Sequence, residues 1–237
     1  MAELIIALDY PEAQPALAAA RTLQGLPVWM KIGLELFTRE GPSVVTALQQ
    51  MQFKIMLDLK MFDIPNTVKG GILSACRLGV DLVTVHTLGG ERMIRAAAGA
   101  IQESSTAGGT LPKLFGITVL TSMAPGELPG YTDNLGDLAE ELAVRGQKWG
   151  LDGVVCSGHE VQRIKKRCPT LLCLTPGIRP ASGFDDDQRR VMTPAQAVQA
   201  GSNYLVVGRP VTKAPHPAVA AREILAEINQ VKSRDAQ

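Results

Sequence analysis

Short β-rich runs alternate with longer helical stretches along the whole chain. The longer stretches repeat apolar residues at helical spacing, as in Ala16–Leu23, Val44–Met51, Met93–Ile101, Leu135–Gly146 and Ala218–Val231. Eight strands are predicted, at Leu4–Asp9, Val28–Glu35, Lys54–Lys60, Leu82–Leu88, Leu114–Ser122, Gly153–Ser157, Leu171–Arg179 and Tyr204–Thr212. Eight strand–helix units with no linker predict an α/β fold, a single (β/α)₈ barrel domain over residues 1–237.

A doubly wound open sheet is the structural alternative. Such sheets usually have fewer strands and often a glycine-rich turn after the first strand. Here the turn after the first predicted strand is Asp9-Tyr10-Pro11-Glu12, which contains no glycine. The barrel is therefore the favoured prediction.

The composition of the chain argues against nucleic acid and membranes as binding partners. Hydrophobic residues make up 46% of the chain and aromatic residues 4%, so an aliphatic core is expected. With 24 basic and 23 acidic residues, the chain has no global field to attract nucleic acid or an anionic membrane. No apolar run is long enough to span a bilayer, and the N-terminus lacks the features of a signal peptide. We therefore expect a cytoplasmic protein that interacts with neither nucleic acid nor membrane.

The four cysteines lack the close paired spacing of a zinc site. They are expected to be small buried hydrophobes in a reducing compartment. The basic cluster from Arg163 to Arg167 lies on a predicted helix and reads as a solvated face.

Polar residues accumulate at the C-terminal ends of the predicted strands. They are Asp9, Lys31, Asp58, Lys60, His86, Thr121, Ser157, Arg179 and Arg209. Barrel enzymes build their active sites at this face from several different strands. The pattern predicts an active site there, whereas His86 is expected to make a structural hydrogen bond at the turn after the fourth strand.

The third predicted strand is the most informative segment. Strand side chains alternate faces, so Asp58 and Lys60 should point into the barrel mouth while Leu57 and Leu59 face the helices. A buried aspartate and lysine are costly unless they pair, and an isolated structural pair would carry little meaning. Asp9, Lys31 and Asp63 on the same rim favour a functional interpretation.

The ends of strands seven and eight suggest an anion site. Barrels often bind phosphate in the loops after these strands, where Arg179, Gly208 and Arg209 stand. The thirteen-residue segment 180–192 is long for a connection in a barrel. It is expected to be a lid that closes on the phosphate through Gln188, the alternative being a solvated surface loop.

The segment Asp58-Leu-Lys60-Met-Phe-Asp63-Ile-Pro-Asn-Thr67 resembles the signature of orotidine 5′-phosphate decarboxylases, D-x-K-x-x-D-I-x-x-T. Further segments resemble the same family, in the family's order and across essentially the whole chain. They are Ala7-Leu8-Asp9, Lys31-Ile-Gly33, Val85-His86 with Gly89-Gly90, Leu120-Thr121-Ser122, Thr175-Pro176-Gly177-Ile178-Arg179 and Val207-Gly208-Arg209-Pro210.

The resemblance implies a role for each matching residue. Lys60 would donate a proton to C6 of the pyrimidine, within a charged array of Lys31, Asp58, Lys60 and Asp63. Asp63 would reach the site from the other subunit of a homodimer, together with Ile64 and Thr67. The substrate-binding positions would be Asp9 and Lys31 for the ribose, Thr121 and Ser122 for the ribose and base, and Gln188, Gly208, Arg209 and Arg179 for the phosphate end.

The chemistry of the implied reaction agrees with these residue types. Loss of CO₂ from C6 leaves a localised carbanion, which needs positive charge and then a proton. An ammonium held between two carboxylates keeps its charge and so serves both needs. The expected enzyme therefore uses neither a metal nor an organic cofactor.

Two rival functions remain open from the sequence. A magnesium-dependent phosphosugar decarboxylase or aldolase would share the D-x-K-x-x-D core, although Ile64-Pro-Asn-Thr67 argues against it. A catalytically silent barrel that only binds a nucleotide is the other. All four residues of the charged array, Lys31, Asp58, Lys60 and Asp63, are present, which argues against a silent barrel.

Overall fold

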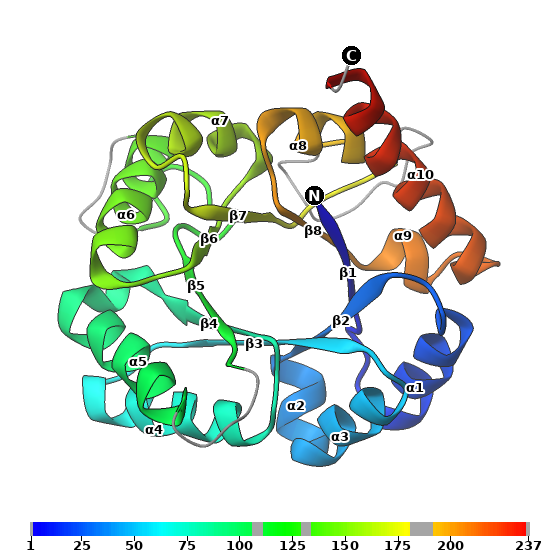
Figure 1. The fold of residues 1–237 in the computed structure, drawn as a ribbon, viewed down its shortest axis with the longest axis horizontal. Helices are drawn as coiled ribbons and strands as arrows, with labels where there is room; N and C mark the ends of the chain where they lie inside the picture. The colour runs from blue at the N-terminus through cyan, green and yellow to red at the C-terminus, as the bar shows by residue number, and fades with distance from the viewer. Residues whose placement is uncertain (1, 106–110, 129–133, 181–191, 236–237) are drawn as a thin grey trace.

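Eight parallel strands close into a barrel in chain order (Figure 1). The computed structural model describes residues 2–105, 111–128, 134–180 and 192–235. The strands are β1 (Glu3–Ala7), β2 (Val28–Gly33), β3 (Lys54–Met61), β4 (Leu82–His86), β5 (Lys113–Ile117), β6 (Gly153–Val155), β7 (Leu172–Thr175) and β8 (Tyr204–Val207). β1 pairs with both β2 and β8, so the predicted (β/α)₈ barrel is confirmed.

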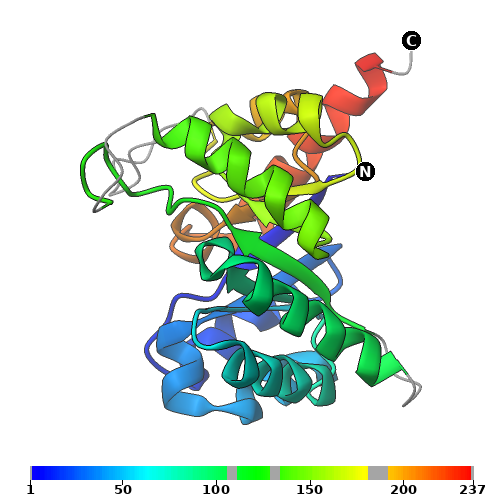
Figure 2. The ribbon, with the colours of Figure 1, turned by 90° about the vertical axis from the view of Figure 1, so that its left-hand side faces the viewer.

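Helices surround the strands on all sides (Figures 1 and 2). They are α1 (Ala13–Thr22), α2 (Leu34–Glu40), α3 (Pro42–Gln50), α4 (Pro65–Arg77), α5 (Gly90–Ser104), α6 (Leu135–Trp149), α7 (Gly158–Arg167), α8 (Pro194–Ala200), α9 (Arg209–Thr212) and α10 (Pro217–Asp235). A 3₁₀ turn, η1 (Thr87–Gly89), follows β4. Among the described helices, none is long and apolar enough to cross a membrane.

Several predicted strands were too long at their C-terminal ends. β8 ends at Val207 because Arg209–Thr212 forms a helix with Pro210 in its first turn, where a proline fits readily. β7 ends at Thr175, just before Pro176 and Gly177, and residues 118–122 leave the sheet after β5. The residues beyond these ends form the rim of the barrel mouth.

The core has an inner and an outer shell. The outer shell, between strands and helices, is aliphatic as predicted. The inner shell departs from that prediction near the N-terminal ends of the strands, where Trp29, Phe115 and Tyr204 meet edge to face at centroid distances of 5.5 and 5.7 Å. These rings fill that end of the barrel, so the polar residues at the other end are left to shape an open mouth.

A repeated three-residue entry precedes β4, β6 and β8. It consists of a glycine with positive φ, a buried residue and an Asp or Asn: Gly79-Val80-Asp81, Gly150-Leu151-Asp152 and Gly201-Ser202-Asn203. Each Asp or Asn makes two hydrogen bonds with a single residue of the preceding strand. Asp81 donates its N–H to the Ile55 carbonyl (2.9 Å) and accepts the Ile55 N–H on Oδ2 (2.8 Å). Asp152 does the same with Leu114, and Asn203 with Cys173, so neighbouring strands are held in register.

Replacing Asp81 with alanine should destabilise the barrel, because the Ile55 N–H loses its acceptor. The expected loss is about 1–2 kcal/mol, or roughly 2–6 °C in melting temperature. Asp81→Asn is the matched control, since Asn203 fills the same role in this chain. Thermal unfolding of the two variants checks this, and an Asn variant as unstable as the Ala variant would refute the role of the side-chain acceptor.

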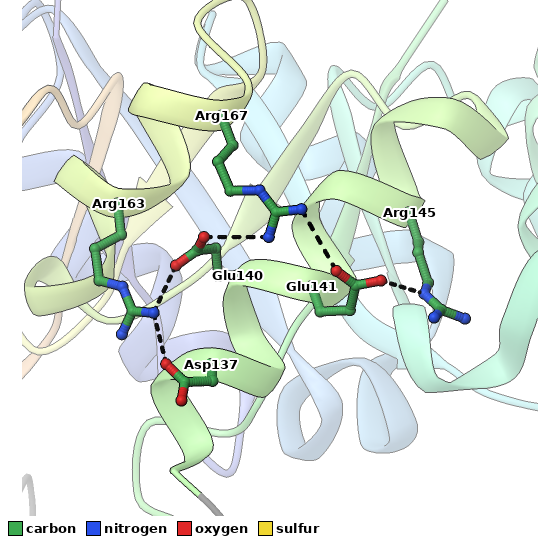
Figure 3. Close-up of polar contacts among 6 residues, drawn as sticks. All are labelled: Asp137, Glu140, Glu141, Arg145, Arg163 and Arg167. Carbon is green, nitrogen blue, oxygen red and sulfur yellow. Dashed lines mark hydrogen bonds and ion pairs between the residues drawn. The ribbon is translucent and has the colours of Figure 1, made fainter.

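An ion-pair network joins α6 to α7 on the outer surface (Figure 3). Arg163 contacts Asp137 and Glu140, and Arg167 contacts Glu140 (3.1 Å) and Glu141 (3.6 Å). The sequence predicted that this basic cluster is only a solvated face. In the structure, two of its arginines also form ion pairs with α6. Apart from Glu140, which is 14% exposed, these side chains are largely exposed, and exposed pairs each contribute little to stability.

The cysteines are free thiols, as expected. Cys156, Cys168 and Cys173 are buried, whereas Cys76 is half-buried. Cys156, Cys168 and Cys173 pack in the aliphatic outer shell, which agrees with their interpretation as small hydrophobic residues.

Candidate active site

A pocket of about 240 Å³ opens at the C-terminal ends of the strands. Its floor is apolar, formed by inner-shell residues that include Met56, Ile117 and Val206. Its polar lining side chains come from most of the strand ends and are joined by the backbone of Gly208: Asp9, Lys31, Asp58, Lys60, Thr121, Arg179 and Arg209. The structure therefore brings together eight of the residues singled out in the sequence.

Four side chains form a continuous charged row across the pocket. The Lys31 ammonium lies 3.1 Å from Asp9 Oδ1 and 3.5 Å from Asp58 Oδ2. Lys60 Nζ lies 2.7 Å from the same Asp58 oxygen. The side chains of Lys31 and Asp58 are 11% and 8% exposed, whereas Lys60 is 30% and Asp9 65% exposed. The row alternates in sign and runs from the solvent at Asp9 through a buried centre to Lys60.

The buried centre of the row keeps both its charges. Burial by itself would lower the pKa of Lys31, but the nearby carboxylates of Asp58 and Asp9 outweigh burial and raise it. Burial would raise the pKa of Asp58, yet the two ammonium groups and hydrogen bonds from Lys60 and Thr84 lower it. A fixed ion array with a buried centre follows, ready to act on charge that appears in a ligand.

Strand β3 is irregular where it carries these residues. Lys60 has a φ of +50°, a left-handed conformation that is uncommon outside glycine. The predicted orientation still holds, because Asp58 and Lys60 pair in the mouth while Leu57 and Leu59 pack in the outer shell. Nothing in the sequence pattern predicts this irregularity. The buried Thr84 hydroxyl, which no motif singled out, donates to Asp58 Oδ1 at 2.9 Å.

Gly33 lies close against the charged row. A Cβ at this position would lie 3.2 Å from Lys31 Nζ and 3.6 Å from Asp9 Oδ1. An alanine here would therefore require the Lys31 ammonium to shift by a few tenths of an ångström. The sequence marked Gly33 only as part of a motif and not for this role.

The part of the pocket formed after β7 and β8 has the features of an anion site. Arg179 follows β7, and Arg209 is the exposed first residue of α9, directly after Gly208. Thr121 lines the pocket, whereas Ser122 is exposed and is not among the lining residues. Gln188, and with it most of the predicted lid, lies outside the described residues.

Asp63, Ile64 and Thr67 lie outside the pocket of their own chain. All three are exposed, and the Asp63 carboxylate accepts the N–H of Ile64 at 2.6 Å. Phe62 and Ile64 beside it are 61% and 67% exposed, which is unusual for large apolar side chains. A second polypeptide covering this segment would explain the exposure.

His86 does not match its prediction. The expected structural hydrogen bond is missing at Nδ1, which is buried without a partner in the part of the chain that the structure describes. The ring instead packs against Phe62, with centroids 5.6 Å apart. Burial, and then the charge of Lys60, lower the pKa of His86.

A search of the described residues finds no group of three or more His, Cys, Asp or Glu side chains that could hold a metal ion. The two pocket carboxylates that might bind one, Asp9 and Asp58, each lie against a lysine ammonium instead. Among the described residues, the positive charge of this pocket comes from Lys31, Lys60, Arg179 and Arg209.

Comparison with known proteins agrees with this geometry. The family model described as "Orotidine 5'-phosphate decarboxylase / HUMPS family" matches residues 2–224. The chain is 58% identical to the orotidine 5′-phosphate decarboxylase of Nitratidesulfovibrio vulgaris (strain DP4) over 234 residues, 98% of this chain and all of that protein. It is 54% identical to the protein of that name from Lawsonia intracellularis, covering 96% of this chain and all of the relative.

A solved structure agrees as well. The crystal structure of orotidine 5′-phosphate decarboxylase from Lactobacillus acidophilus superposes with a TM-score of 0.86 at 36% identity, covering 97% of this chain and all of that one.

Proposed function

Because the chain belongs to the orotidine 5′-phosphate decarboxylase / HUMPS family, we propose that it converts orotidine 5′-phosphate to uridine 5′-phosphate and CO₂ in pyrimidine biosynthesis. The observation that carries the proposal is the buried Lys31–Asp58–Lys60 array in the pocket. The reaction needs no metal and no organic cofactor, because the charge that develops at C6 is met by an ammonium group. We place the enzyme in the cytoplasm.

Lys60 is the group that acts on the reacting carbon. When the C6–carboxylate bond breaks, its electron pair stays on C6 and CO₂ leaves. The Lys60 ammonium stabilises that pair and then donates a proton to it, which forms the C6–H bond and leaves a neutral amine. Solvent reprotonates the amine, since Lys60 is 30% exposed.

Asp58 holds the two lysines and faces the departing carboxylate. Its Oδ2 lies within 2.7 Å of Lys60 Nζ and 3.5 Å of Lys31 Nζ, so one oxygen orients both cations. Asp9 and Lys31 bind the ribose hydroxyls from the outer end of the row. The segment after β5 that contains Thr121 and Ser122 faces the ribose and base, with Thr121 lining the pocket.

The phosphate binds after β7 and β8, between Arg179 and the Gly208-Arg209 turn. Support comes from their positions after β7 and β8, the usual phosphate site of such barrels. We also assign phosphate binding to Gln188, which lies outside the described residues. Binding energy gathered there assembles the site around the base.

The active enzyme is a homodimer in which Asp63, Ile64 and Thr67 enter the partner's site. This is supported by the exposure of Asp63 outside its own pocket and by the apolar Phe62 and Ile64 beside it. Isologous symmetry then gives two equivalent shared sites.

The rival functions have weaker support. A magnesium-dependent phosphosugar enzyme needs free carboxylates, whereas those of this pocket are paired with lysines. A silent nucleotide-binding barrel gives no reason to bury Lys31 and Asp58 together. Loss of orotidine 5′-phosphate ultraviolet absorbance in the presence of EDTA would support the proposal. Absence of turnover with and without magnesium would refute it.

Replacing Arg209 with alanine should slow turnover of orotidine 5′-phosphate by about 10²-fold or more, although Arg209 does not touch the reacting carbon. The nucleoside orotidine, which has no phosphate, provides the control substrate. Its kcat/KM should be nearly unchanged by the substitution. An equal loss on both substrates in steady-state assays would show that Arg209 does not bind the phosphate.

A further inference from the structure

Strand β3 bulges against β4 at the catalytic end of the barrel. Regular pairing joins Leu57 to Val83 and resumes at Met61 with Val85. Asp58, Leu59 and Lys60 therefore lie opposite a single residue, Thr84. In a regular parallel ladder, each N–H of β3 that faces β4 would meet a main-chain carbonyl, and the bulge interrupts that pattern.

At the bulge, the Thr84 hydroxyl serves as the hydrogen-bond acceptor that a main-chain carbonyl would provide in a regular ladder. It accepts the main-chain N–H of Lys60 at 3.0 Å and donates its own proton to Asp58 Oδ1 at 2.9 Å. Thr84 is fully buried. One hydroxyl thus connects the backbone of the proposed proton donor to the carboxylate that orients it.

The bond to Lys60 supports an unfavourable backbone conformation. A non-glycine residue at positive φ, such as Lys60, is strained and persists only where the surroundings hold it. Without an acceptor, the Lys60 N–H would also lose its hydrogen bond. Thr84 is the side chain that meets this N–H, so the left-handed turn that directs Lys60 into the pocket depends on it.

The bond to Asp58 sets the rotation of its carboxylate. Asp58 Oδ2 contacts both lysine ammonium groups, and Thr84 occupies Oδ1. With one oxygen fixed by the barrel wall, the other keeps a defined position between Lys31 and Lys60. Loss of the Thr84 bond would free the carboxylate to turn and draw Lys60 out of line with its target.

We propose that Thr84 is a positioning residue for decarboxylation, acting through Lys60 and Asp58 without touching the substrate. This inference rests on the proposed function. It predicts a defect in the chemical step rather than in nucleotide binding, because a misplaced proton donor matters in the transition state.

Thr84→Val tests the proposal, since valine has nearly the same shape but can neither accept nor donate. We expect kcat to fall by about 10²-fold while the inhibition constant of uridine 5′-phosphate changes less than about threefold. Thr84→Ser keeps the hydroxyl and should retain kcat within about threefold of wild type.

Thr87→Val is the matched control. Thr87 is also fully buried, three residues along the chain, and its hydroxyl has no hydrogen-bond partner among the described residues. The same substitution there removes no bond to the site and should leave kcat unchanged. If Thr84→Val does not fold, Thr84→Cys replaces it, because a thiol is only a weak donor and acceptor; its kcat should fall at least tenfold, with the inhibition constant again little changed.

Three outcomes would overturn the proposal. One is a folded Thr84→Val enzyme, or the Cys variant in its place, with kcat within twofold of wild type. Another is parallel loss of kcat and of uridine 5′-phosphate binding, the mark of general structural damage. The third is an equal defect in Thr87→Val. An inactive wild-type enzyme in the same assay would instead refute the proposed function.

Discussion

Replacing Lys60 with alanine should abolish decarboxylation while uridine 5′-phosphate still binds. The ammonium acts on charge that exists only after the C6–carboxylate bond begins to break, so its loss falls on kcat. Loss of both electrostatic stabilisation and proton donation predicts a decrease of at least about 10⁴-fold. Single-turnover kinetics and calorimetric titration with uridine 5′-phosphate measure the two effects separately.

Lys54→Ala is the control for this variant. Lys54 lies at the opposite end of β3, where its ammonium contacts Glu3 and the Trp29 ring, far along the strand from the mouth. Its removal should leave kcat within about twofold of wild type, as for a surface site away from the chemistry. A Lys60→Ala enzyme that kept a tenth of the wild-type kcat would contradict the assignment of Lys60.

Mixing two inactive variants should restore activity if subunits share their sites. In a heterodimer of Lys60→Ala and Asp63→Ala subunits, one site carries both lesions and the other carries wild-type Lys60 and wild-type Asp63. Random equal mixing makes half the dimers mixed, and half their sites are intact. Activity should therefore approach about a quarter of the wild-type value.

Subunit exchange has to be verified in that experiment, for example by mass-tagging one parent. If Asp63 served its own subunit, every site in the mixture would keep one lesion. Near-zero activity after verified exchange would then exclude sharing, while the decarboxylase assignment would stand. Each parent alone, carried through the same exchange step, provides the baseline.

Two features of the site could be predicted from the sequence: the alternating direction of side chains along a strand, and the residues that follow the strand ends. The period of two placed Asp58 and Lys60 on one side of β3, and the structure confirms that they meet in the mouth. Residues far apart in sequence, such as Asp9 and Arg209, came together because each directly follows a strand of a closed parallel barrel. All strands of the barrel run in the same direction, so residues that follow different strands were expected to meet at one end.

The positions that could not be predicted depend on relations between strands. Thr84 looks like any β-branched residue in a buried strand, and its role exists only because β3 bulges opposite it. The Asp81 carboxylate likewise accepts the N–H of Ile55 on the neighbouring strand, and the pairing of these two residues cannot be read from either strand alone. His86 was assigned a local hydrogen bond, but its ring is held by packing against Phe62.

The most direct test of the central claim follows both products of the reaction in D₂O with EDTA present. Orotidine 5′-phosphate labelled with ¹³C in its carboxyl group should yield one labelled CO₂ for each uridine 5′-phosphate formed. The product should carry one deuteron at C6, because the Lys60 ammonium exchanges with solvent before it donates. Labelled substrate that remains intact, or that loses only its phosphate, would contradict the account.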